Sequence, residues 1–345
     1  METTMASLPP ETWLEIAHFV KSYSLENLAD LSLASSRLMS IARPVFVRTL
    51  TLDATEEEEY EIVDTPILVD TASLRNMSQL KRLRILGRVF IRADEDLKEG
   101  YIEALCGLQL EELSFPWPYC FYPFSEDQFK RITDLKSIEC YSEVDYHEDF
   151  APRCLRLLSG SVSTLTSLSI SAMYIDPDLA MQFLDLRFPL LRSLTFGTWS
   201  EEMHSLEGFH HFLLAHNQTL EHLEMGYTSR REVNPTAFLF DGDDDLPRCC
   251  LPNLRVFKGH CRNVKTVANA SMRASLTKLT IGVSRVEEPK AEINLMLDEI
   301  QSERLMGCMG GLKELDFDFF AAEEDELEWI PAFIQKWGAD LWAVS

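Results

Sequence analysis

Hydrophobic and polar positions repeat in a short pattern from residue 47 onward. The pattern reads apolar-x-x-apolar-x-apolar, as in Leu80-Lys-Arg-Leu83-Arg-Ile85 and Leu165-Thr-Ser-Leu168-Ser-Ile170. Its ten copies lie about 29 residues apart on average and begin at Val47, Leu80, Leu110, Leu135, Leu165, Leu191, Leu220, Leu254, Leu276 and Leu312. Because apolar and polar positions alternate, each copy predicts a short strand with one buried face.

Between the copies, apolar residues recur at helical spacing over residues 177–187, 205–216 and 291–306. A strand and a returning helix in each unit resemble a leucine-rich-repeat solenoid. The resemblance implies an α/β fold, with about ten irregular strand–helix repeats, a parallel sheet on the concave face of a curved array, and one shared core.

The sequence departs from the leucine-rich-repeat pattern in two ways. The Asn or Cys that usually follows the strand is missing, and Gly259 takes an apolar position in the copy at Leu254. The register at Leu254 therefore stays open at this point. The alternative to a solenoid is an ordinary α/β fold in which the alternation arises by chance.

The first fifty residues predict three short helices. Pro9 and Pro10 fit a first helical turn, and Pro44 ends the third segment. A unit of about forty residues lies at the lower limit of independent stability. Its apolar side chains therefore need a partner surface.

This N-terminal segment resembles an F-box. The resemblance rests on Leu8-Pro9-Pro10-Glu11, on Ile16 and on the leucine-rich run 28–38. Ala34 and Leu38 replace the family's usual Val and Trp, and both remain apolar. The alternative is a helical cap that only seals the following domain.

The F-box resemblance implies a substrate receptor of a Skp–cullin–F-box (SCF) ubiquitin ligase. Such a receptor binds the Skp adaptor and, through it, the cullin, while a second domain binds a protein substrate. The positions that the resemblance places against the adaptor are Leu8, Pro9, Ile16, Leu28, Leu31 and Leu38.

Two domains follow from these patterns: an F-box helical module over residues 1–46 and a leucine-rich-repeat-like solenoid over residues 47–345. The apolar spacing within residues 328–342 predicts a C-terminal helical cap over the last repeat. Because the first strand pattern begins at Val47, we expect a rigid junction without a flexible linker.

The concave face of such an array would be formed by the third, fifth and seventh positions of each copy. Charged residues at these positions and aromatic residues beside them are typical of protein-binding surfaces. The alternative for each aromatic residue is packing against the strand end. The candidate substrate-binding residues are Arg82, Arg84, Glu112, Trp117, Glu139, Tyr141, Trp199, His222, Glu224, Tyr227, Lys258 and Lys278.

The net charge of −24 narrows the choice of partners. It disfavours nucleic acid and anionic membrane surfaces, which need Lys and Arg contacts, and it attracts basic protein segments. No run approaches 18 consecutive apolar residues, so we expect no membrane span.

The eight cysteines lack the C-x-x-C spacing of metal sites, and the N-terminal stretch lacks a secretory signal pattern. We therefore expect free, buried thiols in a reducing compartment, the cytoplasm or the nucleus.

Nothing in the sequence matches a common catalytic or phosphate-binding motif. His204, His210, His211 and His216 cluster, but residues 204 and 211 share a helix face that 210 does not. We expect a non-enzyme without cofactor or metal. The alternatives are a leucine-rich-repeat scaffold without a ubiquitin role, and a hydrolase or metal enzyme in a divergent α/β fold.

Overall fold

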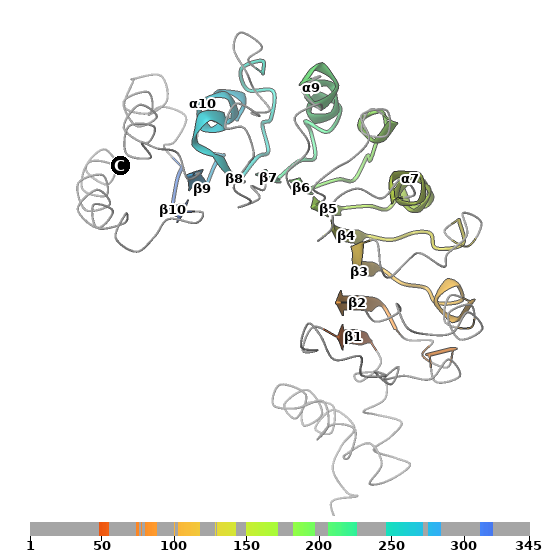
Figure 1. The fold of residues 1–345 in the computed structure, drawn as a ribbon. Helices are drawn as coiled ribbons and strands as arrows, with labels where there is room; N and C mark the ends of the chain where they lie inside the picture. Colours follow the sequence, from red (N-terminus) through yellow and green to blue (C-terminus); the bar gives the residue numbers. More distant parts are fainter. Residues whose placement is uncertain are drawn as a thin grey trace, which may run out of the picture. The chain divides into compact units, whose positions relative to one another are not determined.

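A computed structural model of the chain contains a sheet of ten short strands, which lie in the order of the sequence from β1 to β10 (Figure 1). No helix within the described residues is long and apolar enough to cross a membrane. The structure describes residues 48–54, 74–75, 77, 80–87, 100, 103–117, 128, 130–142, 150–171, 182–196, 206–225, 246–271, 275–283 and 311–319.

Every strand begins two residues after the start of its copy of the repeat pattern, including the copy at Leu254. The predicted α/β repeat fold of the leucine-rich type is therefore confirmed, with each strand displaced toward the C-terminus. The strands are β1 Thr49–Ala54, β2 Arg82–Gly87, β3 Glu112–Trp117, β4 Ser137–Ser142, β5 Ser167–Ser171, β6 Ser193–Phe196, β7 His222–Met225, β8 Val256–His260, β9 Lys278–Val283 and β10 Glu314–Phe319.

Three helices are described: α7 (Phe150–Ser161), α9 (Leu206–Ala215) and α10 (Cys261–Ala270). The prediction for residues 205–216 is confirmed by α9, whereas α7 and α10 were not singled out. Within 177–187, the described helical residues are 182–184. The predicted helices at 291–306 and 328–342 and the module at 1–46 lie outside the described residues, so the domain boundary stays a prediction.

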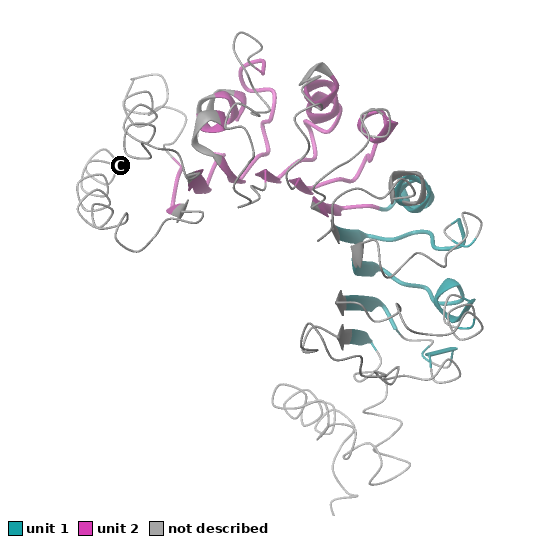
Figure 2. Cartoon of the chain, viewed as in Figure 1, with its two compact units in different colours: residues 1–141, 152–164 teal, residues 142–151, 165–345 magenta. Residues whose placement is uncertain are grey.

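The chain divides into two compact units (Figure 2). Unit 1 comprises residues 1–141 and 152–164, and unit 2 comprises residues 142–151 and 165–345. In unit 1, β2 pairs in parallel with β1 and β3. In unit 2, parallel pairing runs without interruption from β5 to β10.

The core consists of the apolar positions of the repeat pattern. In β6, for example, Leu194 and Phe196 are buried, while Ser193 and Thr195, which alternate with them, are half-buried. Leu80, Ile85, Leu165, Leu191 and Leu220 are likewise almost completely buried. Burial of one such side chain contributes about 1.5–3 kcal/mol, so the shared core holds successive repeats together.

Within each unit, backbone hydrogen bonds link successive repeats at the second pattern position. The Lys81 carbonyl accepts the N–H groups of Glu111 and Glu112 at 2.7 and 2.9 Å, and the Arg192 carbonyl accepts those of Glu221 and His222 at 2.8 and 2.9 Å. Within each unit, the turn before every strand after the first is thus bonded twice to the preceding repeat. This explains why each strand begins two residues into the pattern.

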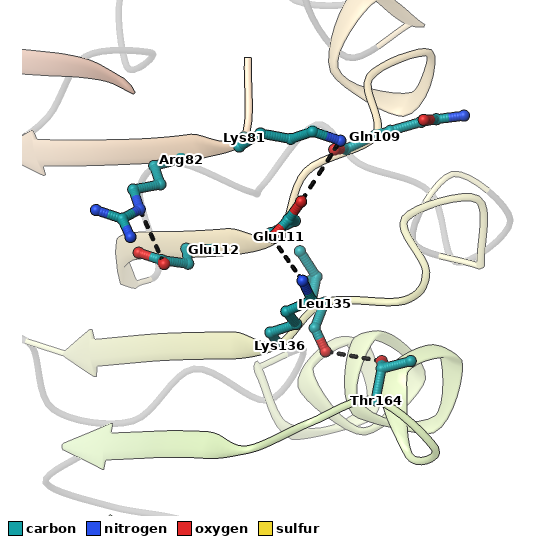
Figure 3. Close-up of polar contacts among 8 residues, drawn as sticks. All are labelled: Lys81, Arg82, Gln109, Glu111, Glu112, Leu135, Lys136 and Thr164. Atoms are coloured by element: carbon teal, nitrogen blue, oxygen red, sulfur yellow. Dashed lines mark hydrogen bonds and ion pairs between the residues drawn. The ribbon is translucent and has the colours of Figure 1, made fainter. Parts of the chain in front are cut away.

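Side chains that precede a copy of the pattern also bond one repeat to the next. In unit 1, Ser161 Oγ accepts the Leu135 N–H at 3.2 Å, and Thr164 Oγ1 donates to the Leu135 carbonyl at 2.9 Å (Figure 3). These bonds satisfy backbone groups that burial would otherwise leave unpaired.

The glycine that interrupts the apolar pattern makes room for an aromatic ring. A Cβ at Gly259 would lie 2.6 Å from Cζ of Phe257, which is fully buried. We expect Gly259→Ala to lower the free energy of unfolding by about 1–3 kcal/mol through overpacking, measured by urea denaturation. In the control Gly107→Ala, the nearest atom lies 3.4 Å away and stability should stay nearly unchanged. Equal stability of the two variants would contradict this explanation.

Candidate functional site: the open face of the strands

The third and fifth pattern positions form the face of the strands opposite the core, here called the open face. None of its described side chains is buried. In unit 1 it consists of Thr49, Thr51, Arg82, Arg84, Glu112, Ser114, Ser137 and Glu139. In unit 2 it consists of Ser167, Ser169, Ser193, Thr195, His222, Glu224, Val256, Lys258, Lys278, Thr280, Glu314 and Asp316.

In unit 1, three of the four charged side chains of the open face bind neighbours on the adjacent strand. Arg82 Nε lies 2.9 Å from Glu112 Oε1 (Figure 3), and Ser114 Oγ donates to Glu139 Oε2 at 2.6 Å. The register that places Arg82 opposite Glu112 brings the first pair together. These predicted substrate-binding residues are therefore held in position before any partner arrives.

In unit 2, the open face begins with small polar side chains. Ser167 pairs in register with Ser193, and Ser169 with Thr195. These hydroxyls offer hydrogen bonds without bulk or charge, so a partner can approach the backbone closely on β5 and β6.

The next strands of unit 2 carry charges in pairs. Lys258 Nζ lies 3.1 Å from Glu224 Oε1. Partial burial lowers the pKa of His222, against the opposing effect of Glu224, so His222 is neutral at physiological pH. The predicted residues on β7 and β8 therefore lie together as one polar group.

Lys278 joins two carboxylates on the last described strand. Its Nζ lies 2.8 Å from Glu314 Oε2 and 3.2 Å from Asp316 Oδ2. The hydrogen bonds that Lys278 donates to Glu314 and to Asp316, the first having the larger effect, raise the pKa of Lys278. The described open face carries four basic and five acidic side chains, so it is nearly neutral in a strongly acidic protein.

The structure places the remaining predicted residues unevenly. Trp117 is the last residue of β3 rather than a residue beyond it, and Tyr141 lies in β4. Trp199 and Tyr227 lie outside the described residues, as do all six predicted adaptor-binding residues. The adaptor site therefore stays a prediction.

A buried histidine, not predicted from the sequence, bonds two repeats of unit 2. The Phe188 N–H donates to His216 Nε2 at 2.9 Å, so Nδ1 carries the proton and donates to the Phe212 carbonyl at 2.6 Å. The ring centroid lies 4.2 Å from that of Phe212 and 5.9 Å from that of Phe188. His216 thus has a structural role, because its ring nitrogens bond backbone groups of two repeats.

Burial lowers the pKa of His216, with a smaller opposing effect from the Phe212 carbonyl and a further lowering by Arg187. The unfolded chain therefore binds a proton more readily than the folded one. We therefore expect the contribution of His216 to the free energy of unfolding to be fully present above pH about 6.5. This contribution should be lost as the pH falls toward the lowered pKa of His216 in the folded protein. Urea denaturation from pH 7.5 to 5 should show a flatter pH dependence in His216→Gln. Parallel profiles for both proteins would contradict this assignment.

Five cysteines are free: Cys106, Cys140, Cys154, Cys249 and Cys250. Cys140 and Cys154 are buried as expected, but Cys249 is exposed. Burial raises the pKa of Cys106 and of Cys250 to about 11, so both thiols are protonated at neutral pH. The described residues contain no group of three or more His, Cys, Asp or Glu placed to hold a metal ion.

The sequence matches no protein-family model and no curated protein. Among solved structures, it is similar to a chain of the Rad7–Elc1 complex of yeast, with 16% identity and a TM-score of 0.45, over 89% of this chain and 74% of that chain. It is also similar to the leucine-rich repeat-containing protein LegL7 from Legionella pneumophila, with 12% identity and a TM-score of 0.42, over 78% of this chain and 83% of that chain. At these TM-scores, neither likeness adds to the fold that the strand order and register define.

Proposed function

We propose that this chain is the substrate-recognition subunit of an SCF-type ubiquitin ligase. Its F-box-like segment, residues 1–46, binds the Skp adaptor and through it the cullin, and the open face of the repeats binds a protein substrate. The chain is not itself an enzyme and needs no cofactor, because it acts by holding the substrate near a separate catalytic subunit. Its free thiols support a cytoplasmic or nuclear location.

The proposal that the repeats bind a substrate rests on one observation: the open face of the parallel sheet is polar, and none of its described side chains is buried. All-parallel sheets normally have both faces covered by other elements. Here the opposite face forms the core, whereas every described open-face side chain stays half-buried or exposed. Successive strands at about 4.8 Å spacing make this face long enough for an interface of standard size.

The pairing of charges on the open face suggests how a substrate is recognised. Because Arg82 and Glu112, and Glu224 and Lys258, neutralise each other, a partner gains little from net charge there. Hydrogen bonds and the order of the charged pairs supply specificity instead. The overall charge of −24 still attracts a basic substrate at long range.

The adaptor-binding half rests on the sequence resemblance and is tested by direct binding. Purified full-length chain is immobilised and exposed to purified Skp adaptor at micromolar concentration. The receptor function predicts capture of the adaptor. A repeat scaffold without a ubiquitin role would keep its open-face partners and leave the adaptor in solution, which would contradict the proposal.

A further inference from the structure

A second surface runs beside the open face. It consists of the residues at the second pattern position, which lie along the N-terminal edge of the strands and are here called the edge row. Six of these ten residues are basic, although the chain has 32 Lys and Arg against 56 Asp and Glu. The edge row comprises Arg48, Lys81, Glu111 and Lys136 in unit 1, and Thr166, Arg192, Glu221, Arg255, Thr277 and Lys313 in unit 2.

The backbone spaces the edge row regularly. The Arg255 carbonyl accepts the N–H groups of Thr277 and Lys278 at 2.8 and 3.0 Å, and the Thr277 carbonyl accepts those of Lys313 and Glu314 at 2.8 and 3.1 Å. Arg255, Thr277 and Lys313 therefore lie immediately before three consecutive strands, β8, β9 and β10. At about 4.8 Å per strand, the Cα atoms of Arg255 and Lys313 are about 10 Å apart.

In unit 1, the basic residues of the edge row beside Glu111 are engaged by it. Glu111 lies 3.6 Å from Lys81 Nζ and 2.7 Å from Lys136 Nζ, and Lys81 also donates to the Gln109 carbonyl (Figure 3). The hydrogen bond from Lys136 is the main cause of the lowered pKa of Glu111. The Glu111 carboxylate thus forms ion pairs with two lysines.

In unit 2, the corresponding carboxylate, that of Glu221, forms an ion pair with one cation. Arg192 lies 3.0 Å from Glu221, while Arg255, on the other side of Glu221, is exposed. Lys313 is exposed as well, and within the described part of the chain neither Arg255 nor Lys313 has a side-chain ion pair or hydrogen bond. Thr277 between them is uncharged. Unit 2 therefore presents two available cations on one edge.

We propose that Arg255 and Lys313 bind an acidic, extended segment of a partner protein along this edge. Acidic side chains at alternate positions of an extended chain lie about 7 Å apart, within reach of two long side chains based about 10 Å apart. The ligand lies along the edge rather than over β10, where Glu314 and Asp316 oppose the single charge of Lys278. This surface is separate from the open face and does not depend on a ubiquitin role.

The test uses a fluorescent peptide of alternating Glu and Ser, with a Gln-Ser peptide as the neutral probe, and the full-length chain. By anisotropy, the chain should bind the Glu-Ser peptide, less tightly as salt rises, and should ignore the neutral one. Arg255→Glu with Lys313→Glu should weaken binding about tenfold or more. The charge-retaining pair R255K and K313R should bind as the wild type does. So should the control pair R75E and R156E, which reverses two exposed charges in unit 1.

Three results would overturn the proposal. The first is equal binding by the charge-reversed and wild-type chains. The second is an equal loss in the unit 1 control, which would show an effect of net charge alone. The third is binding that appears only after Asp241, Asp243, Asp244 and Asp245 are changed to Asn, which would assign the edge to the chain's own acidic segment.

Discussion

Replacing Leu8 and Leu31 with aspartate is expected to abolish capture of the Skp adaptor. Both residues occupy positions that the F-box resemblance places against the adaptor. Each buried leucine contributes about 1.5–3 kcal/mol, and a buried unpaired carboxylate adds a further cost. The double variant should therefore bind more than about a hundredfold more weakly in a titration with purified adaptor.

A leucine outside this segment provides the matched control. Leu190 is 48% exposed in the repeats, so Leu190→Asp introduces the same chemistry without an expected contact. It should bind the adaptor as the wild type does. Circular dichroism should show intact repeats in both variants. Adaptor binding by the Leu8 and Leu31 variant at wild-type strength would show that these residues are not adaptor contacts.

Replacing Phe212 with alanine is expected to lower the free energy of unfolding by about 3–5 kcal/mol, because it leaves a cavity in the centre of an aromatic cluster. Phe212 is fully buried. Its ring centroid lies 5.4 Å from that of Phe183 and 6.3 Å from those of Phe188 and Phe196. It also packs on His216, so the substitution disturbs the polar link between repeats. Urea denaturation measures the loss.

Leu190→Ala is the corresponding control, because this exposed side chain loses little contact on truncation. Its stability should lie within about 0.5 kcal/mol of the wild type. A Phe212→Ala loss no larger than that of the control would mean that the aromatic cluster does not stabilise unit 2.

The strands could be predicted because burial of one face imposes a period of two on the sequence. The pattern located all ten, and even the irregular copy at Leu254 holds its register in β8. Their starts were displaced because the first apolar residue of the copy, wherever the structure describes it, precedes the strand. The backbone N–H groups that bond to the carbonyl at the second pattern position belong to the next repeat. Backbone bonds of this kind cannot be read from the order of apolar and polar side chains.

The helices were harder to predict. In α10, the buried apolar residues Val264, Val267 and Ala270 are few and small among polar neighbours, so the segment is only weakly apolar although its spacing is helical. In α7, polar residues likewise separate the buried Cys154, Leu157 and Leu158, so the segment is much less apolar than α9. Tertiary packing decides both helices more than propensity does.

The sequence predicted which charged residues lie on the open face, but not which of them form ion pairs. Glu224 and Lys258 lie 34 residues apart, and only the register of β7 with β8 places them opposite each other. His216 was missed because its two backbone partners belong to different repeats. Such contacts follow from three-dimensional neighbours, which a single sequence does not reveal.

One measurement tests the receptor function most directly: affinity capture from cells with the proteasome inhibited, using wild type, the Leu8→Asp and Leu31→Asp variant, and the charge swap Glu224→Lys with Lys258→Glu. The swap keeps the ion pair but inverts its direction on the open face. Wild type should recover the adaptor together with ubiquitin-modified substrates. The first variant should lose the adaptor and the ubiquitin modification while keeping the unmodified substrates, and the swap should lose the substrates while keeping the adaptor. Recovery of the same proteins by all three, or absence of the adaptor from the wild type, would contradict the account.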